Sequence, residues 1–178
     1  MLFPMRQNPP ESYVTRGSIS VAPIAALRGA SLNYPSWVTD RYLQLPTSYP
    51  DNLKTLALEL VTGQNTTYDK VSNIQTFLLA LPRHKALVAP PPNREPMDWF
   101  INVQHVGFSN YYASAMTTML RSLGIPARLV AGFAPGEWDD QRQAWVVKAK
   151  HYHAWPEVYF PGYGWVEFEP TPMKVQPS

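Results

Sequence analysis

The chain has no cysteine among its 178 residues. This absence excludes disulfide bonds, zinc sites built from thiolates and catalysis by a thiol in the sequence as it stands. A strong charge of either sign is also missing, because 15 Lys and Arg residues accompany 13 Asp and Glu residues, a formal net charge of +2. Without a run of Lys or Arg, we expect no nucleic-acid partner and no attraction to an anionic membrane surface.

Long hydrophobic runs are absent too. No segment approaches the roughly 18 consecutive apolar residues of a membrane-spanning helix, and the apolar tract at residues 21–30 is interrupted by Pro23 and Arg28. Residues 1–6 lack the basic start and the long apolar centre of a signal peptide. We therefore expect a soluble piece that is attached to a membrane only through parts outside this chain.

What is present predicts one folded domain. Hydrophobic residues make up 45% of the sequence and aromatic residues 13%, which is typical of a chain that builds a core. The irregular residues 1–35 predict an N-terminal arm or an added edge strand, with a possible strand near residues 12–20. Residues 36–178 predict the core domain.

Helical patterns come first along the core. After a short extended piece predicted at residues 41–45, Asp51 is expected to cap a helix that Gly63 ends, and Thr66 or Thr67 to open a second one that ends at Pro82. A third helix is predicted at residues 110–123, ended by Gly124. It is expected to bury one wide apolar stripe made of Tyr112, Ala115, Met116, Met119, Leu120 and Leu123.

Strand patterns follow the third helix. Four β-rich runs, at residues 128–133, 143–148, 152–160 and 165–168, are separated by Gly, Pro and Asp turns. This order predicts an α+β fold in which the third helix packs on an antiparallel meander. On adjacent strands, Trp145, Trp155 and Trp165 would be packing residues or walls of a groove. Pro156 lacks an N–H group, so its strand should have an edge or a bulge there.

Three polar residues are placed where a catalytic triad would need them. Ser109 precedes the third predicted helix, as a candidate N-cap at its positive end. His151 and His153 lie two apart on a predicted strand and should point to one face, while Glu169 follows the end of the next strand. A hydroxyl, an imidazole and a carboxylate can act as nucleophile, base and orienting group.

The motifs that carry these residues resemble a known family. The stretches Gly-Phe-Ser-Asn-Tyr-Tyr-Ala-Ser-Ala-Met, Met-Leu-Arg-Ser-Leu-Gly-Ile-Pro-Ala-Arg, His-Ala-Trp-Pro-Glu-Val-Tyr and Gly-Trp-Val-Glu-Phe-Glu-Pro-Thr are similar to the transglutaminase-like core, in particular that of bacterial membrane-anchored proteins. The resemblance is specific over residues 98–171 and looser back to Tyr42. It implies a papain-like fold and an extracytoplasmic domain of a bacterial membrane protein.

The resemblance also implies a chemistry. In the family a cysteine attacks a glutamine carboxamide, ammonia leaves, and the acyl group passes to a lysine amine or to water, with no cofactor. The cysteine position is occupied here by Ser109, the histidine is His153 and the acid is Glu169. The Ser109 N–H would be one oxyanion-hole donor. A second donor is expected among Gln104, Asn102 and Trp99, and further groove residues are Asn110, Tyr111 and Trp155.

The departure at Ser109 leaves several functions open. A hydroxyl cannot be stored in ionised form as a thiol can, so we expect little or no acyl transfer. Either a cysteine was replaced deliberately, or the chain is a natural relative without its nucleophile. The alternatives are a non-catalytic module that binds a peptide or a peptidoglycan stem, and a serine hydrolase that uses Ser109, His153 and Glu169. A metal site at His151, His153 and a carboxylate is the weaker interpretation of the two histidines.

Overall fold

The computed structural model describes residues 14, 20–82 and 88–172. The predicted strand near residues 12–20 lies outside these residues, apart from positions 14 and 20. Within the predicted arm, helix α1 (Ile24–Arg28) packs on α4, and its Leu27 is buried in the core. The boundary placed at residue 35 stays a prediction.

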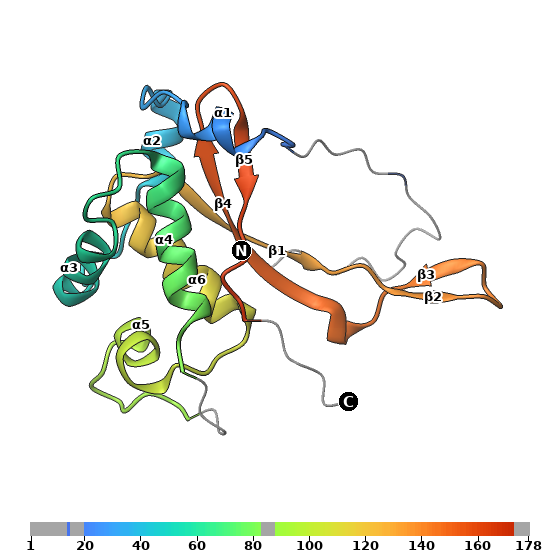
Figure 1. Ribbon diagram of the computed structural model, residues 1–178. Helices are drawn as coiled ribbons and strands as arrows, with labels where there is room; N and C mark the ends of the chain where they lie inside the picture. Colours follow the sequence, from blue (N-terminus) through green and yellow to red (C-terminus); the bar gives the residue numbers. More distant parts are fainter. Residues whose placement is uncertain (1–13, 15–19, 83–87, 173–178) are drawn as a thin grey trace.

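The helices form the larger part of the body (Figure 1). After α1 come α2 (Ser36–Tyr42), α3 (Asp51–Leu60), α4 (Thr67–Leu79), α5 (Pro96–Trp99), the π-helix η1 (Phe100–Gln104) and α6 (Ser109–Ser122). The Thr66 cap of α4 is confirmed, because its hydroxyl oxygen accepts a hydrogen bond from the Asp69 N–H at 3.1 Å. Asp51 does not cap α3: it is the first helical residue, and Pro50 holds the cap position.

Helix α2 corrects the extended piece predicted at residues 41–45. Residues 41 and 42 close this helix, and only the following residues are irregular. The helix is held by contacts that local sequence does not reveal. The Trp37 ring packs edge-on against Tyr159, the Tyr42 ring packs in the same way against Trp165, and Val38 is fully buried.

The main sheet has the strand order β1-β4-β5 and is antiparallel throughout. Its strands are β1 (Ala127–Phe133), β4 (Tyr152–Phe160) and β5 (Gly164–Glu167), while β2 (Glu137–Asp139) and β3 (Ala144–Val146) form a separate two-stranded hairpin. This hairpin projects from the far end of β1 and β4 (Figure 1). The expected single meander is therefore wrong in one respect. Trp145 lies on the projecting hairpin, 63% exposed, and not beside Trp155.

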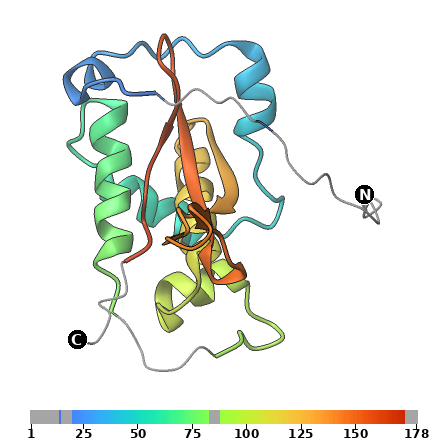
Figure 2. The ribbon, with the colours of Figure 1, turned by 90° about the vertical axis from the view of Figure 1, so that its right-hand side faces the viewer.

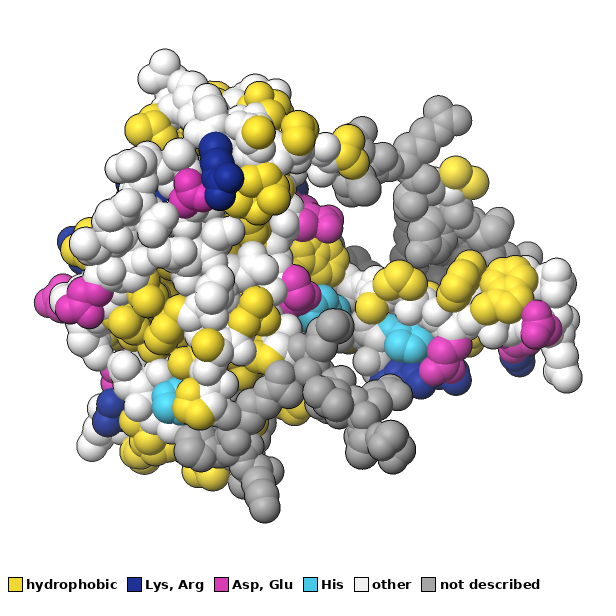
Figure 3. Space-filling view, viewed as in Figure 1, with side chains coloured by type: hydrophobic (Ala, Val, Ile, Leu, Met, Phe, Trp, Pro, Cys, Tyr) yellow, Lys and Arg dark blue, Asp and Glu magenta, His cyan; other side chains and the backbone are white. Residues whose placement is uncertain are grey.

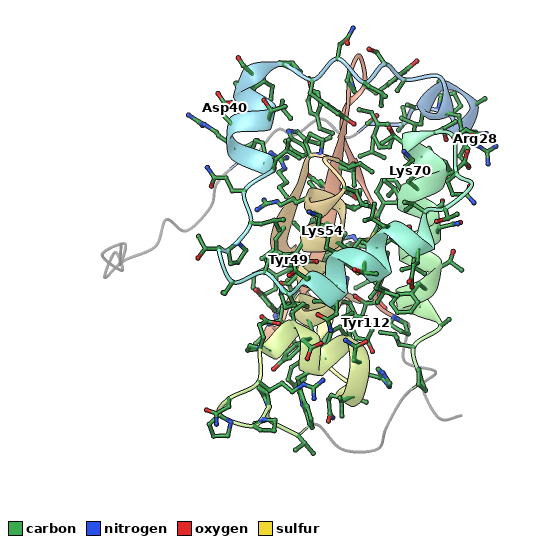
Figure 4. The ribbon with its side chains drawn as sticks, turned by 90° about the vertical axis from the view of Figure 1, so that its left-hand side faces the viewer. Arg28, Asp40, Tyr49, Lys54, Lys70 and Tyr112 are labelled. Carbon is green, nitrogen blue, oxygen red and sulfur yellow. The ribbon has the colours of Figure 1, made fainter. Side chains whose placement is uncertain are left out.

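Helix α6 is the centre of the core. It packs against β1 and β4 on one side and against α3 and α4 on the other, and it lies directly behind the strands in Figure 2. Met116, Met119 and Leu120 are fully buried, as the predicted stripe requires. Figure 4 shows α3 crossing α4 and α6.

The end of α6 follows the sequence prediction. Gly124 has φ +74° and directs its N–H to the Arg121 carbonyl at 3.0 Å, while the Ile125 N–H bonds to the Leu120 carbonyl at 3.0 Å. This is a Schellman motif, in which glycine adopts the left-handed conformation at little cost.

The predicted α+β fold, with a central helix on an antiparallel sheet, is confirmed. Among the described residues, no helix is long and apolar enough to cross a membrane.

Candidate active site

Ser109 is the first residue of α6 and not its cap. The cap position belongs to Phe108, whose backbone is extended (φ −76°, ψ 172°). The Ser109 hydroxyl is used differently: its oxygen accepts a hydrogen bond from the backbone N–H of Ala154 on β4, at 3.0 Å. The Ser109 N–H lies in the first turn, where backbone N–H groups lack helical partners and the helix dipole favours negative charge.

The end of the β4–β5 ladder explains why the Ala154 N–H is available. The β4–β5 register sets Val158 opposite Val166, and its continuation would set Ala154 opposite Pro170. The Phe168 N–H still bonds to the Pro156 carbonyl at 3.0 Å, but neither proline has an N–H of its own. The two prolines thus remove two ladder donors, and β5 ends at Glu167, so the next N–H on this side of β4 bonds to the serine instead.

At Pro156 we expected an edge or a bulge. There is no bulge, because the register of β4 with β1 runs unbroken through the pairing of Leu129 with Pro156. There is an edge, because the last strand pair between β4 and β5 is Glu157 with Glu167. The proline is tolerated because its missing N–H would face the β5 side, just past the last residue of β5. Pro156 therefore lies where the β5 side of β4 loses its strand partner, and β4 is not interrupted there.

His153 and Glu169 meet beside this serine. His153 lies on β4 directly before Ala154, and its Nε2 atom hydrogen-bonds to Oε2 of Glu169. The other carboxylate oxygen, Oε1, accepts the backbone N–H of Thr171 at 2.8 Å, which orients the carboxyl group. When Nε2 carries the proton donated to Glu169, Nδ1 is the ring nitrogen that can accept one.

One cavity collects all three residues. Its volume is about 950 Å³, and Ser109, His153 and Glu169 all line it. Figure 3 shows histidine and acidic side chains adjoining in the hollow between the helical body and the projecting strands. The arrangement can therefore bring a hydroxyl, an imidazole and a carboxylate to one substrate.

The second histidine lies apart from this group. His151 is in the 3₁₀ turn η2 (Ala149–His151), not on the strand with His153, and its Nδ1 accepts the Lys148 N–H at 2.9 Å. The expectation that the two histidines share a strand face is wrong, because the chain turns between the hairpin and β4. No group of three metal-ligating side chains exists among the residues that the structure describes.

Only some of the predicted groove residues line the cavity. Asn110 lines the cavity, whereas Gln104, Trp99, Tyr111 and Trp155 are not among its lining residues. Tyr111 instead lies against Gly107, where an added Cβ would come within 2.6 Å of the Tyr111 Cβ and Cγ atoms. Its ring packs on Phe100, 5.6 Å away between centroids.

Two of the three candidates for a second oxyanion donor bond to other groups, and the third, Gln104, stays a prediction. The Trp99 indole donates to the Val88 carbonyl at 3.4 Å, and the Asn102 amide donates to Asp98 at 2.8 Å. Gln104 is buried, 7% exposed, at the end of η1. Sequence order alone does not reveal the place of Asn102, because residues 100–104 form a π-helix, which rotates side chains relative to an α-helix.

Trp155 agrees with the packing alternative of its prediction and not with the groove-wall alternative. Its ring stacks on His153, with centroids 6.2 Å apart and planes 17° apart. It also lies over Gly132 of β1, where an added Cβ would come within 3.0 Å of the indole. Trp155 is therefore a neighbour of the imidazole rather than a wall of the cavity.

Sequence reasoning missed several residues at the cavity. Tyr112 lines it and donates its hydroxyl to the His105 carbonyl at 2.8 Å; the residue lies where α6 meets the α5–η1 segment (Figure 4). Phe108 and Tyr152, 68% and 55% exposed, also line it. Phe108 directly precedes Ser109 and Tyr152 directly precedes His153. Their position next to predicted triad residues was the signal in the sequence that could have identified them.

A charged group borders the cavity. Lys150 lines it and pairs with Glu137 of the hairpin, which also accepts a hydrogen bond from Lys148 at 2.9 Å. Hydrogen bonds from Lys150 and Lys148 lower the pKa of Glu137 to about 2. The carboxylate therefore stays ionised at neutral pH and ties this rim of the cavity to the hairpin.

Comparison with known proteins identifies the class. A family model described as the transglutaminase-like superfamily matches residues 54–170. Two curated proteins are similar: the uncharacterized protein YebA of Bacillus subtilis (strain 168), 37% identical over 147 residues, and a protein-glutamine gamma-glutamyltransferase of Pseudomonas aeruginosa, 33% identical over 131 residues. The matches cover 79% and 74% of this chain and 20% of each relative.

Solved structures agree with this assignment. The periplasmic domain of TgpA from Pseudomonas aeruginosa superposes with a TM-score of 0.69 at 31% identity, covering 77% of this chain and 48% of that one. A cysteine-protease-like protein from Cytophaga hutchinsonii shares the fold, with a TM-score of 0.57 at 18% identity over 86% of this chain and 48% of that one. The chain belongs to the transglutaminase-like superfamily. It spans about a fifth of the length of the curated relatives it matches.

Proposed function

We propose that the cavity is a transglutaminase-like acyl-transfer site in which Ser109 occupies the position of the family's cysteine. The observation that carries the proposal is the contact of Ser109 Oγ with the backbone of Ala154, directly after His153, whose ring is bonded to Glu169. All three side chains line the same cavity. Acyl transfer by this fold needs that combination of nucleophile, base and orienting carboxylate.

The reaction would proceed in two stages. The Ser109 oxygen attacks the carboxamide carbon of a glutamine side chain while its proton passes to Nδ1 of His153, and the resulting oxyanion lies near the positive end of α6. The C–N bond then breaks, His153 returns the proton to the departing ammonia, and an acyl ester remains. A lysine amine or water attacks this ester in the reverse sequence, and Ser109 is regenerated.

The serine makes this chemistry weak. A cysteine in the same place could be held as a thiolate by the imidazole and the helix dipole, whereas a hydroxyl must lose its proton during the attack. Oxygen is also smaller than sulfur, and a misplacement of about 1 Å can cost about 10²-fold in rate. We therefore expect the chain to show little or no acyl transfer until Ser109 is replaced by cysteine.

The decisive experiment is Ser109→Cys. Ammonia release and amine incorporation into a glutamine-containing protein should rise about 10²-fold or more over the parent chain, and His153→Ala in the same background should abolish the gain. Glu169→Gln keeps the shape of the side chain and should lower the activity without unfolding the protein. If Ser109→Cys gains no activity that depends on His153, the acyl-transfer proposal is wrong.

Two other functions would appear in the same set of measurements. Tight binding of a peptide or of a peptidoglycan stem, with no gain from Ser109→Cys, would indicate a binding module. Labelling of the unaltered Ser109 by a fluorophosphonate would indicate a serine hydrolase. The substrate that we propose is a protein or peptide with glutamine or lysine side chains. The similarity to a periplasmic domain supports a location outside the cytoplasm.

A further inference from the structure

The Ala154 N–H occupies an unusual place in β4. On the β5 side of the strand, Val158 and Phe160 are paired with β5, and Pro156 has no N–H to give. Ala154 is the next residue on that side, and its N–H donates to the Ser109 oxygen. A strand amide that would ordinarily bond to a neighbouring strand is thus aimed at the atom expected to act as nucleophile.

The surroundings strengthen this hydrogen bond. Ala154 is 1% exposed, so its amide is shielded from water, and an unpaired N–H there would be costly. An amide N–H can only donate, so the serine oxygen must accept. The hydroxyl proton therefore remains free for donation to an imidazole nitrogen, and Nδ1 is the one that Glu169 does not occupy.

This geometry matters most when the nucleophile loses its proton. In the Ser109→Cys chain the thiol proton moves to Nδ1 of His153 and the electron pair stays on the sulfur as a thiolate. In the parent chain the pair enters the new bond to the carboxamide carbon, so only partial charge builds on the serine oxygen during the attack. In both cases this charge lies on the atom that receives the Ala154 N–H. Hydrogen bonds to an ionised acceptor are roughly twice as strong as neutral ones. A donor that is already in place needs no reorganisation when the charge develops.

We infer that the backbone N–H of Ala154 is a catalytic group of this site, which stabilises negative charge on the nucleophile atom at position 109. The inference rests on the proposed function and concerns the nucleophile atom, not the substrate oxyanion for which a donor was expected at residues 99, 102 and 104. The amide is free of the sheet because β5 stops pairing at Glu167, and the prolines at positions 156 and 170 lack the two N–H donors that would continue the ladder.

A purely structural bond would behave differently. If the serine oxygen only satisfied a buried strand amide, deleting the N–H would change stability but not the acidity of the group at position 109. A catalytic donor must favour the ionised nucleophile over the neutral one. The pH dependence of nucleophile reactivity therefore separates the two roles.

The test replaces one backbone amide by an ester. In the full chain carrying Ser109→Cys, Ala154 is replaced by lactic acid, which keeps the methyl side chain and removes only the N–H. Alkylation by iodoacetamide is then followed across pH. We expect the rate at neutral pH to fall about tenfold and the midpoint of the pH profile to move upward, because the ionised form has lost a donor.

A second ester, at another position of β4, controls for the effect of the amide-to-ester replacement itself. Val158 is replaced by the corresponding hydroxy acid, which removes an N–H directed at β5 and far from the nucleophile. This control should destabilise the sheet and leave the alkylation profile unchanged. An unchanged profile for the Ala154 ester would overturn the inference. Since alkylation needs no acyl transfer, the failure of the proposed function would be seen separately, in the ammonia assay.

A second measurement covers the case in which the ester chain does not fold. In the unmodified protein, the Ala154 amide proton is followed by NMR, with Trp155 as reference, whose N–H points to β1. Ser109→Ala should move the Ala154 proton upfield and speed its exchange with solvent deuterium at least tenfold relative to Trp155. Equal behaviour of the two amides would show that the serine does not accept this bond, and the inference would fail.

Discussion

Gly107 lies two residues before the candidate nucleophile. A substitution at this position therefore tests whether the first turn of α6 can move without loss of function. Built on this residue, a Cβ atom would lie 2.6 Å from both the Cβ and the Cγ atom of Tyr111. Carbon atoms in van der Waals contact are about 3.5–4.0 Å apart. Gly107→Ala therefore requires a movement of about 1 Å, either of this turn or of the first turn of α6.

The expected cost has two parts. Overpacking of this kind typically destabilises a protein by about 1–3 kcal/mol. A shift of about 1 Å at Ser109 would further reduce catalysis about 10²-fold. Tyr111 cannot easily give way, because its ring is packed against Phe100 of η1.

The assay combines urea unfolding with ammonia release in a chain that carries Ser109→Cys. Gly162→Ala is the matched control: it lies in the β4–β5 turn with nothing within 4 Å, but its φ is +86°. This control should lose about 1 kcal/mol of stability through backbone strain alone and keep full activity.

A companion pair of variants sharpens the steric argument. Tyr111→Ala retains its Cβ, 2.6 Å from the added methyl, so it should not rescue Gly107→Ala. Tyr111→Gly removes that atom, so a double-mutant cycle should show coupling between positions 107 and 111. If Gly107→Ala matches the parent in both stability and rate, the turn is looser than the structure indicates, and the reasoning is refuted.

Two further predictions concern stability. Met116→Ala should lower the free energy of unfolding by about 2–5 kcal/mol, measured by urea denaturation, because Met116 is fully buried at the centre of α6; a loss below about 1 kcal/mol would contradict the packing. Burial opposes ionisation of Asp98, but hydrogen bonds from Asn52, Asn102 and Arg94 outweigh it and lower its pKa. Its stabilisation is therefore complete above about pH 4 and is lost as pH falls through the lowered pKa. Asp98→Asn should flatten this part of the pH–stability curve, and an unaltered acid limb would refute the assignment.

Local patterns predicted the parts of the fold that depend on neighbours in the chain. The apolar stripe of α6 follows the helical period, the left-handed backbone at its end requires Gly124, and the Thr66 hydroxyl caps the residue three positions later. The interactions that define these features span at most a few residues. For the same reason the strand runs at residues 128–133 and 152–160 were recognisable.

Features that depend on distant contacts were predicted less well. Helix α2 is held by rings on β4 and β5, so residues 41 and 42, which looked extended, are helical. The hairpin leaves the main sheet, which separates Trp145 from the other tryptophans, and the turn at η2 separates His151 from His153. None of these outcomes can be recognised from neighbouring residues in the sequence, because each depends on contacts between distant segments.

The sequence by itself determined the order of helices α3, α4 and α6 and of the strands that follow them and, through its motifs, the three residues to examine: Ser109, His153 and Glu169. Only the tertiary structure decided that the serine oxygen accepts an N–H from β4, 45 residues away along the chain. The physical reason is that this bond exists only where β5 has stopped pairing. That point is set by where three separate segments meet, and not by the preference of any one of them.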